Sequence, residues 1–313
     1  MTHFLVTGAS GLLGLNFSVK MAEHHKIVGA VHQQVLCQPP FPIVQVDLSE
    51  KGAVEKLVQQ VRPEVVLHCA ALANVDQCED EPELALRLNA ELPGELAAVC
   101  KRQQIRLVHI STDAVFDGQR GDYIETDPAN PINAYARTKL AGEQAVRDAN
   151  PDAIIARVNF YGWSLKGRRS LAEIFYYTLS ANQPMRGFTD VFFCPFNVDQ
   201  LSDMLLMMLE KELKGLYHVV SPESLSKYQF GQMIVSQFGL DAGLLTPSSW
   251  RDAGLKAVRS PNLVLNCQKL SQDLGAVLPG QMAGMQLFHA QFCSGLPERL
   301  RRMGGLDEAD KPA

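Results

Sequence analysis

The chain has 313 residues, 46% of them hydrophobic and 20% charged, with a formal net charge of −5. The excess of acids speaks against nucleic acid or an anionic membrane as a partner, and no apolar run approaches the ~18 residues of a membrane span. Its seven cysteines are scattered without metal-ligand spacing, which predicts reduced thiols, no metal site and a cytoplasmic protein.

Short apolar runs alternate with amphipathic stretches in the first half of the chain. Strands are expected at 3–7, 26–31, 43–46, 64–68, 105–110 and 153–158, and helices at 11–23, 53–61, 82–101 and 133–148. Strands that alternate with helices imply right-handed crossovers and a parallel sheet covered on both faces. The predicted fold class is therefore α/β, with a doubly wound parallel Rossmann sheet.

After residue 158 the alternation loosens. Helices are expected at 170–181, 198–211 and 226–238, separated by irregular stretches that contain proline and glycine. At about 150 residues per domain, the length allows two domains. We predict a nucleotide-binding Rossmann domain over 1–158 and a smaller, mainly helical substrate or lid domain over 159–306, some segments of which return to the sheet. Residues 307–313 are polar and are expected to form a flexible tail.

A glycine-rich turn lies between the first strand and the first helix, with the spacing G-x-x-G-x-x-G. Glycines there allow a tight turn and a close approach to a pyrophosphate, whose charge the helix N-terminus favours. The alternative is a turn without a ligand, but its place after an N-terminal strand favours a dinucleotide. The residues expected at the cofactor phosphates are Gly8, Ser10, Gly11, Leu12, Leu13 and Gly14.

No acid follows the second strand, where a carboxylate would bind the adenosine ribose of NAD. This favours NADP(H), with NAD(H) possible because no arginine stands there either. His32 could assist or could be only a surface residue. Asp47, at the end of the third strand beside Leu48, could accept a bond from adenine or cap the next helix.

Further cofactor contacts are expected where the fourth and sixth strands end. Ala70 and Ala71 are small enough to let the backbone lie against the cofactor ribose, although they could equally be packing residues. Val158 ends the sixth strand and completes the expected cofactor-binding set.

A candidate catalytic set follows the fifth strand. Tyr135 and Lys139 are four residues apart on the expected helix and therefore share one face. An adjacent lysine favours the phenolate and is expected to lower the tyrosine pKa, so that Tyr135 could protonate a carbonyl oxygen as hydride arrives. Lys139 could also hold the nicotinamide ribose, and Thr112 could hydrogen-bond the same oxygen. Such Tyr–Lys pairs alone are common on solvated faces, so the combination with the glycine turn carries the argument.

The sequence resembles the extended short-chain dehydrogenases, and among them the dTDP-4-dehydrorhamnose reductase group. The matching stretches are TGASGLLG at 7–14, VD at 75–76, STDAVFDG at 111–118, ETDP at 125–128, PINAYARTKLAGE at 131–143 and GLYH at 215–218. The resemblance implies reduction by NADPH or NADH of a 4-keto group on a nucleotide-linked deoxysugar. It also implies Thr112, Tyr135 and Lys139 as the catalytic trio. The substrate residues expected from it are Val75, Asp76, Asp113, Asn159, Phe160 and Trp163.

Several positions depart from the group's pattern, which indicates an altered sugar pocket. Ala114 replaces the usual aromatic residue, and Phe160 with the nearby Trp163 stands where the group has a tryptophan. A nucleotide-sugar dehydratase would need a glutamate at the position of Ala114, which speaks against that activity. An epimerase remains an alternative, as does a regulatory subunit like the β subunit of methionine adenosyltransferase, which resembles the same group. A homodimer is possible.

Overall fold

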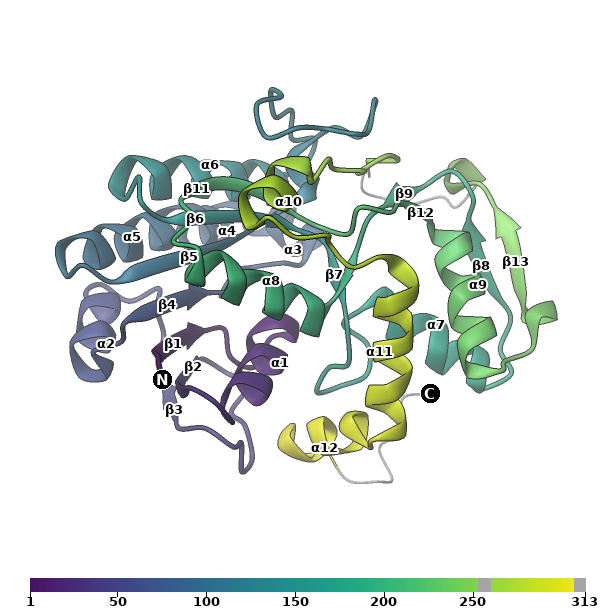
Figure 1. Ribbon diagram of the computed structural model, residues 1–313, viewed down its shortest axis with the longest axis horizontal. Helices are drawn as coiled ribbons and strands as arrows, with labels where there is room; N and C mark the ends of the chain where they lie inside the picture. The colour runs from purple at the N-terminus through teal and green to yellow at the C-terminus, as the bar shows by residue number, and fades with distance from the viewer. Residues whose placement is uncertain (253–259, 307–313) are drawn as a thin grey trace.

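Seven parallel strands form one central sheet in the computed structural model, which describes residues 1–252 and 260–306 (Figure 1). Their spatial order is β3-β2-β1-β4-β5-β6-β11. The bounds are β1 His3–Thr7, β2 Lys26–Val31, β3 Ile43–Gln45, β4 Val65–His68, β5 Arg106–Thr112, β6 Ile154–Val158 and β11 Gly215–Val219. The predicted Rossmann sheet is thus confirmed. β11 comes from the second half of the chain and pairs with β6 at the sheet edge.

Helices cover both faces of this sheet, as the uninterrupted apolar strands require. Side chains alternate along each strand, so Leu5 and Leu107 share one buried layer with the apolar residues of α2 and α5, while Phe4 and Val108 share the other with those of α1 and α8. The helices of this part are α1 Leu12–Met21, α2 Ala53–Val61, α3 Val75–Asp80, α4 Pro82–Leu86, α5 Leu92–Arg102, α6 Ala134–Ala149 and α8 Val198–Glu210.

The helix expected over 82–101 is not continuous. A π-helical turn, Arg87–Glu91, separates α4 from α5. Pro93 follows it and has no N–H to donate to the carbonyl of Asn89, and its ring would press on that carbonyl in a regular α-helix. The freed Asn89 carbonyl lies against α6, where a Cβ on Gly142 would come within 2.1 Å of its oxygen.

Most of the remaining elements lie to the right of the sheet in Figure 1, with α11 between them and α1, whereas α10 packs against β11 at the sheet edge. Three two-stranded ladders join β7 to β10, β9 to β12 and β8 to β13. The strands are β7 Phe160–Tyr161, β8 Met185–Phe188, β9 Phe192–Phe193, β10 Phe196–Asn197, β12 Leu225–Ser226 and β13 Leu245–Ser248. The helices are α7 Leu171–Ser180, α9 Lys227–Phe238, α10 Gln268–Leu274, α11 Gln281–Cys293 and α12 Leu296–Met303, with short 3₁₀ turns at Asp113–Val115, Ala242–Leu244 and Trp250–Asp252.

The expected tail at 307–313 lies outside the described residues. Within the part of the chain that the structure describes, none of the helices combines the length and the apolar character that crossing a membrane would take.

Candidate active site at the carboxyl ends of the strands

The glycine turn after β1 is shaped by close backbone contacts. Gly8 has φ +65°, and a Cβ there would lie 2.8 Å from the Ala70 nitrogen. A Cβ on Gly14 would lie 2.4 Å from the Gly8 oxygen, which also accepts a 2.8 Å hydrogen bond from the Gly11 nitrogen. Only glycine fits these positions without a shift of the backbone.

The first turn of α1 fits an anionic group. Its N-cap is Gly11, which makes no side-chain cap, and the turn holds no acid. Its backbone N–H groups are therefore available to a pyrophosphate, and the helix dipole favours one there. Ser10 and Leu12 are half-buried at the turn, whereas the Leu13 side chain lies in the core, so Leu13 could contribute only its backbone.

Two predicted adenosine-side residues meet beyond β2 and β3. The Nε2 atom of His32 lies 3.4 Å from Oδ2 of Asp47, and both side chains are more than one-third exposed. Asp47 accepts hydrogen bonds from the nitrogen and hydroxyl of Ser49, at 2.8 and 2.6 Å, which lower its pKa. It does not cap α2, whose N-cap is Gly52, so that alternative is wrong. A carboxylate thus lies beside the end of β2 in space although none follows it in sequence. Leu48 is half-buried next to it.

The end of β4 is bonded to the glycine turn. The hydroxyl of Thr7 and Nδ1 of His68 are 2.7 Å apart, and the Ala70 nitrogen donates to the same hydroxyl at 3.3 Å. The Ala70 backbone is therefore held against Gly8, while Ala71 is exposed. Burial, with a smaller contribution from Lys139, lowers the pKa of His68 to about 3, so this histidine is neutral at physiological pH.

The structure brings the three candidate catalytic residues together where β5 ends. α6 begins after Asn133, whose side chain accepts a hydrogen bond from the Ala136 nitrogen at 2.9 Å. One turn of helix then separates Tyr135 from Lys139 on the face toward β5. Nζ of Lys139 donates to the Ile110 carbonyl at 2.6 Å, and Thr112 lies close enough to Tyr135 to influence the pKa of its phenol.

Burial acts in opposite directions on the two titratable members of this set, because it always disfavours the charged form. It raises the pKa of Tyr135 to about 12, against the hydrogen bond with Thr112, which lowers it. The expectation that the lysine would lower this pKa is therefore wrong for the protein alone. Burial lowers the pKa of Lys139 to about 8, and the nearby carboxylate of Glu143 opposes that shift. At neutral pH Tyr135 is a phenol with a proton to donate, and Lys139 is largely charged.

Asp113 and Asn159 are direct neighbours in this site. The Asp113 carboxylate accepts hydrogen bonds from the Thr112 hydroxyl, at 3.1 Å, and from the Asn159 amide. Only 4% of Asp113 is exposed, and burial raises its pKa to about 6 in spite of these hydrogen bonds. Val158, at the end of β6, is buried next to Asn159 in the chain.

The other predicted substrate residues differ in how far they are buried. Trp163 is fully buried, stacks on Phe288 at 4.0 Å between ring centroids and donates to the Phe288 carbonyl at 3.1 Å, so it belongs to the core rather than to a cleft wall. Phe160 is half-buried in β7. Val75 and Asp76 form the first turn of α3, which packs against α6, and Asp76 is exposed there.

The sequence reasoning missed a buried ion pair behind Lys139. Glu143 and Arg157 are bonded through Nε and Oε1 at 2.9 Å and through Nη2 and Oε2 at 2.8 Å, and their side chains are 0% and 3% exposed. The Ser111 hydroxyl donates to the same carboxylate at 2.5 Å. The available signal was the spacing, because Tyr135, Lys139 and Glu143 follow one another every four residues along α6.

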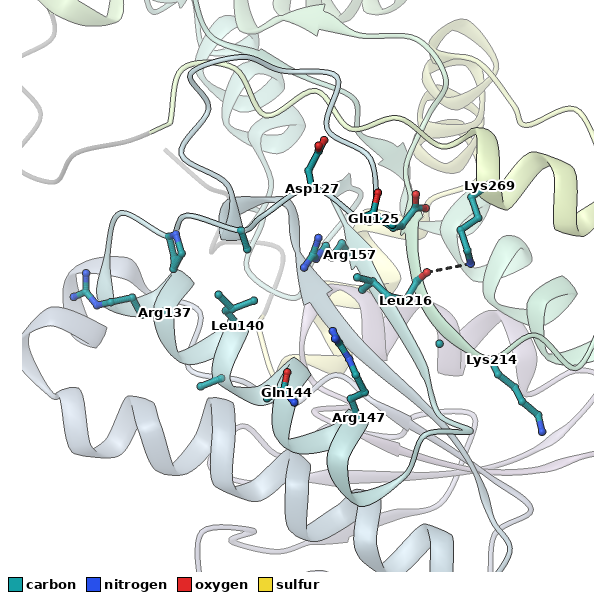
Figure 2. Close-up of a pocket in the computed structure, with 15 residues that line it drawn as sticks. Glu125, Asp127, Arg137, Leu140, Gln144, Arg147, Arg157, Lys214, Leu216 and Lys269 are labelled. Carbon is teal, nitrogen blue, oxygen red and sulfur yellow. Dashed lines mark hydrogen bonds between the residues drawn. The ribbon is translucent and has the colours of Figure 1, made fainter.

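A cavity of about 1060 Å³ lies on another side of α6, beside the sheet edge at β11 (Figure 2). Thr112, Tyr135 and Lys139 do not line it. Its basic wall includes Arg147 and Lys269, and Nζ of Lys269 donates to the Leu216 carbonyl at 3.2 Å. Arg157 also reaches this wall, but its guanidinium is bonded to Glu143.

The glycine turn, the parallel sheet and the Thr–Tyr–Lys set are those of an extended short-chain dehydrogenase/reductase. Residues 1–293 match the family described as RmlD substrate binding domain, and the chain belongs to that family.

Related proteins align over most of the chain. A probable low-salt glycan biosynthesis reductase of Haloferax volcanii is 36% identical, over 93% of this chain and 98% of that protein. Methionine adenosyltransferase 2 subunit beta of Pongo abelii is 33% identical, over 85% and 80%. Among solved structures, the dTDP-4-dehydrorhamnose reductase of Bacillus anthracis in complex with NADP superposes with a TM-score of 0.80 and 27% identity, over 93% of this chain and all of that one.

Proposed function

We propose that the protein is an NADPH-dependent reductase of a 4-keto group on a nucleotide-linked deoxysugar. The observation that carries the proposal is the convergence of Thr112, Tyr135 and Lys139 at the end of β5, across from the glycine turn. The similarity to two reductases, one of them solved with NADP, supports it. NADH is a possible second cofactor, because the carboxylate of Asp47 lies beside the end of β2.

The chain's own groups fit reduction of a carbonyl. Gly8, Gly11 and Gly14 would hold the pyrophosphate, and the charged Lys139 would hold the nicotinamide ribose. The bound nicotinamide would supply a hydride to the carbonyl carbon. Tyr135 would transfer its phenolic proton to the carbonyl oxygen, which Thr112 orients by a hydrogen bond. The high pKa of Tyr135 keeps that proton in place until it is needed.

Asp113 and Asn159 are placed to bind the sugar. Carboxylate and amide groups hydrogen-bond hydroxyls, and the two side chains are already bonded to each other next to Thr112. Asp76, exposed on α3, is a further candidate contact with the substrate. Ala114 follows Asp113 at a position where the group has an aromatic residue, which points to a sugar that differs from the one the group usually takes.

The test is NADPH oxidation against a panel of 4-keto nucleotide sugars. Tyr135→Phe should lower kcat by ~10²- to 10⁴-fold with little change in NADPH affinity, because only the transferred proton is removed. Lys139→Met should lower activity and also weaken cofactor binding, and Thr112→Val should cost ~10²-fold. Tyr176→Phe, in the aromatic cluster of α7, is the matched control and should behave as the parent. A fully active Tyr135→Phe enzyme would refute the assignment.

A regulatory role is the second candidate, favoured by the similarity to methionine adenosyltransferase subunit beta. A regulator needs to bind a partner, but it has no need of a proton donor. The two roles are separated by the same panel together with co-purification against a methionine adenosyltransferase. Binding of that enzyme without turnover of any sugar would favour the regulator.

A further inference from the structure

Lys139 is buried among several titratable groups, of which Glu143 favours its charged form. Its Nζ is bonded to the Ile110 carbonyl, and only 3% of the residue is exposed. The titratable groups that act on it or respond to it are His68 and Cys69 from the end of β4, His109 from β5, and Glu143 from its own helix. Burial keeps both histidines and the Cys69 thiol neutral. Glu143 is thus the acid among these groups.

The position of Glu143 is fixed from two strands. Arg157 of β6 holds both of its oxygens, and Ser111 of β5 donates to one of them. Ser111 lies between Ile110, whose carbonyl accepts a hydrogen bond from Lys139, and the candidate catalytic residue Thr112. The ion pair and the Ser111 hydrogen bond therefore connect α6 to β6 and β5 close to the candidate catalytic residues.

We propose that Glu143 is a positioning residue of the active site, whose carboxylate, held by Arg157 and Ser111, keeps the Lys139 ammonium charged and α6 seated against β5 for cofactor binding and proton donation. The inference rests on the proposed function and deepens it. If the Glu143–Arg157 pair only fills space, uncharged side chains of the same volume can replace it. If the charge of Glu143 matters, such a replacement changes how cofactor binding depends on pH.

The experiment measures the NADPH dissociation constant by fluorescence titration from pH 6 to 10 in the parent, E143Q and the double variant E143Q/R157Q. Affinity in the parent should fall above about pH 8, as Lys139 loses its proton. Without the Glu143 charge this fall should move to lower pH by about 1 unit, which weakens binding about tenfold on the alkaline side. The double variant removes the unpaired Arg157 cation that E143Q leaves buried, so it should recover folding stability but keep the shifted profile.

Glu55→Gln is the matched control, since Glu55 of α2 forms an exposed ion pair with Arg102, and it should show the parent profile. A parent-like profile in folded E143Q, or its return in the double variant, would overturn the proposal in favour of a packing role. If E143Q does not fold, the double variant carries the same test. A parent that binds NADPH but reduces no sugar would refute the reductase while the pH test of Glu143 still stands.

Discussion

Burial of the Asp113 carboxylate in the site should lower the free energy of unfolding at neutral and alkaline pH. Its pKa is raised from 3.8 to about 6 by burial, so the folded protein binds a proton that the unfolded chain has already released. The sign follows from linkage: the stability contributed by the protonated group is complete below about pH 4 and is lost as the pH rises through 6. A difference of about 2 pKa units corresponds to at most ~3 kcal/mol.

Asp113→Asn replaces the carboxyl by a neutral group that can still bond to Thr112 and Asn159. We expect the variant and the parent to be equally stable at pH 4, and the variant to be more stable by ~1–3 kcal/mol at pH 8. Urea unfolding at several pH values measures this difference, with the exposed Asp148→Asn as the matched control. A stability difference between Asp113→Asn and the parent that does not change with pH would show that burial of the charge is not what sets its cost. Reductase activity should fall, because the sugar loses a carboxylate partner.

Two further predictions concern close backbone contacts. Gly14→Ala places a Cβ 2.4 Å from the Gly8 oxygen, so NADPH affinity should fall at least tenfold; unchanged affinity in a titration would show that the turn is not the phosphate site. Gly142→Ala places a Cβ 2.1 Å from the Asn89 oxygen and should push α6 away from the π-helical turn. The free energy of unfolding should then fall by ~1–3 kcal/mol. A thermal melt that matches the parent would contradict this packing.

Local patterns were enough to predict the sheet. Each strand from β1 to β6 is a short and mainly apolar run, and buried parallel strands have this appearance whatever surrounds them. The glycine turn was predictable for the same reason, because the backbone conformation of Gly8 restricts the residue itself. The Tyr135–Lys139 spacing placed both side chains on one face of α6 before their partners were known.

Features that depend on residues far apart in the chain could not be predicted in this way. The Asp47 carboxylate reaches His32 from a different strand, so the absence of an acid after β2 was an incomplete guide to the cofactor. Trp163 lies near Asn159 in sequence, but its stacking on Phe288, 125 residues later, takes it into the core. The pKa of Tyr135 depends on how deeply α6 is buried, which the helix sequence alone does not contain.

Burial of the catalytic helix has two consequences that pull against each other. It favours the phenol of Tyr135, the form that can donate a proton, and it disfavours the ammonium of Lys139, the form that can hold a ribose. Burial alone would therefore favour proton donation by Tyr135 but weaken cofactor binding by Lys139. The buried carboxylate of Glu143, one turn beyond Lys139, favours the charged ammonium of Lys139 while Tyr135 stays buried. Arg157 makes that carboxylate tolerable in the core, since an unpaired buried charge would cost several kcal/mol.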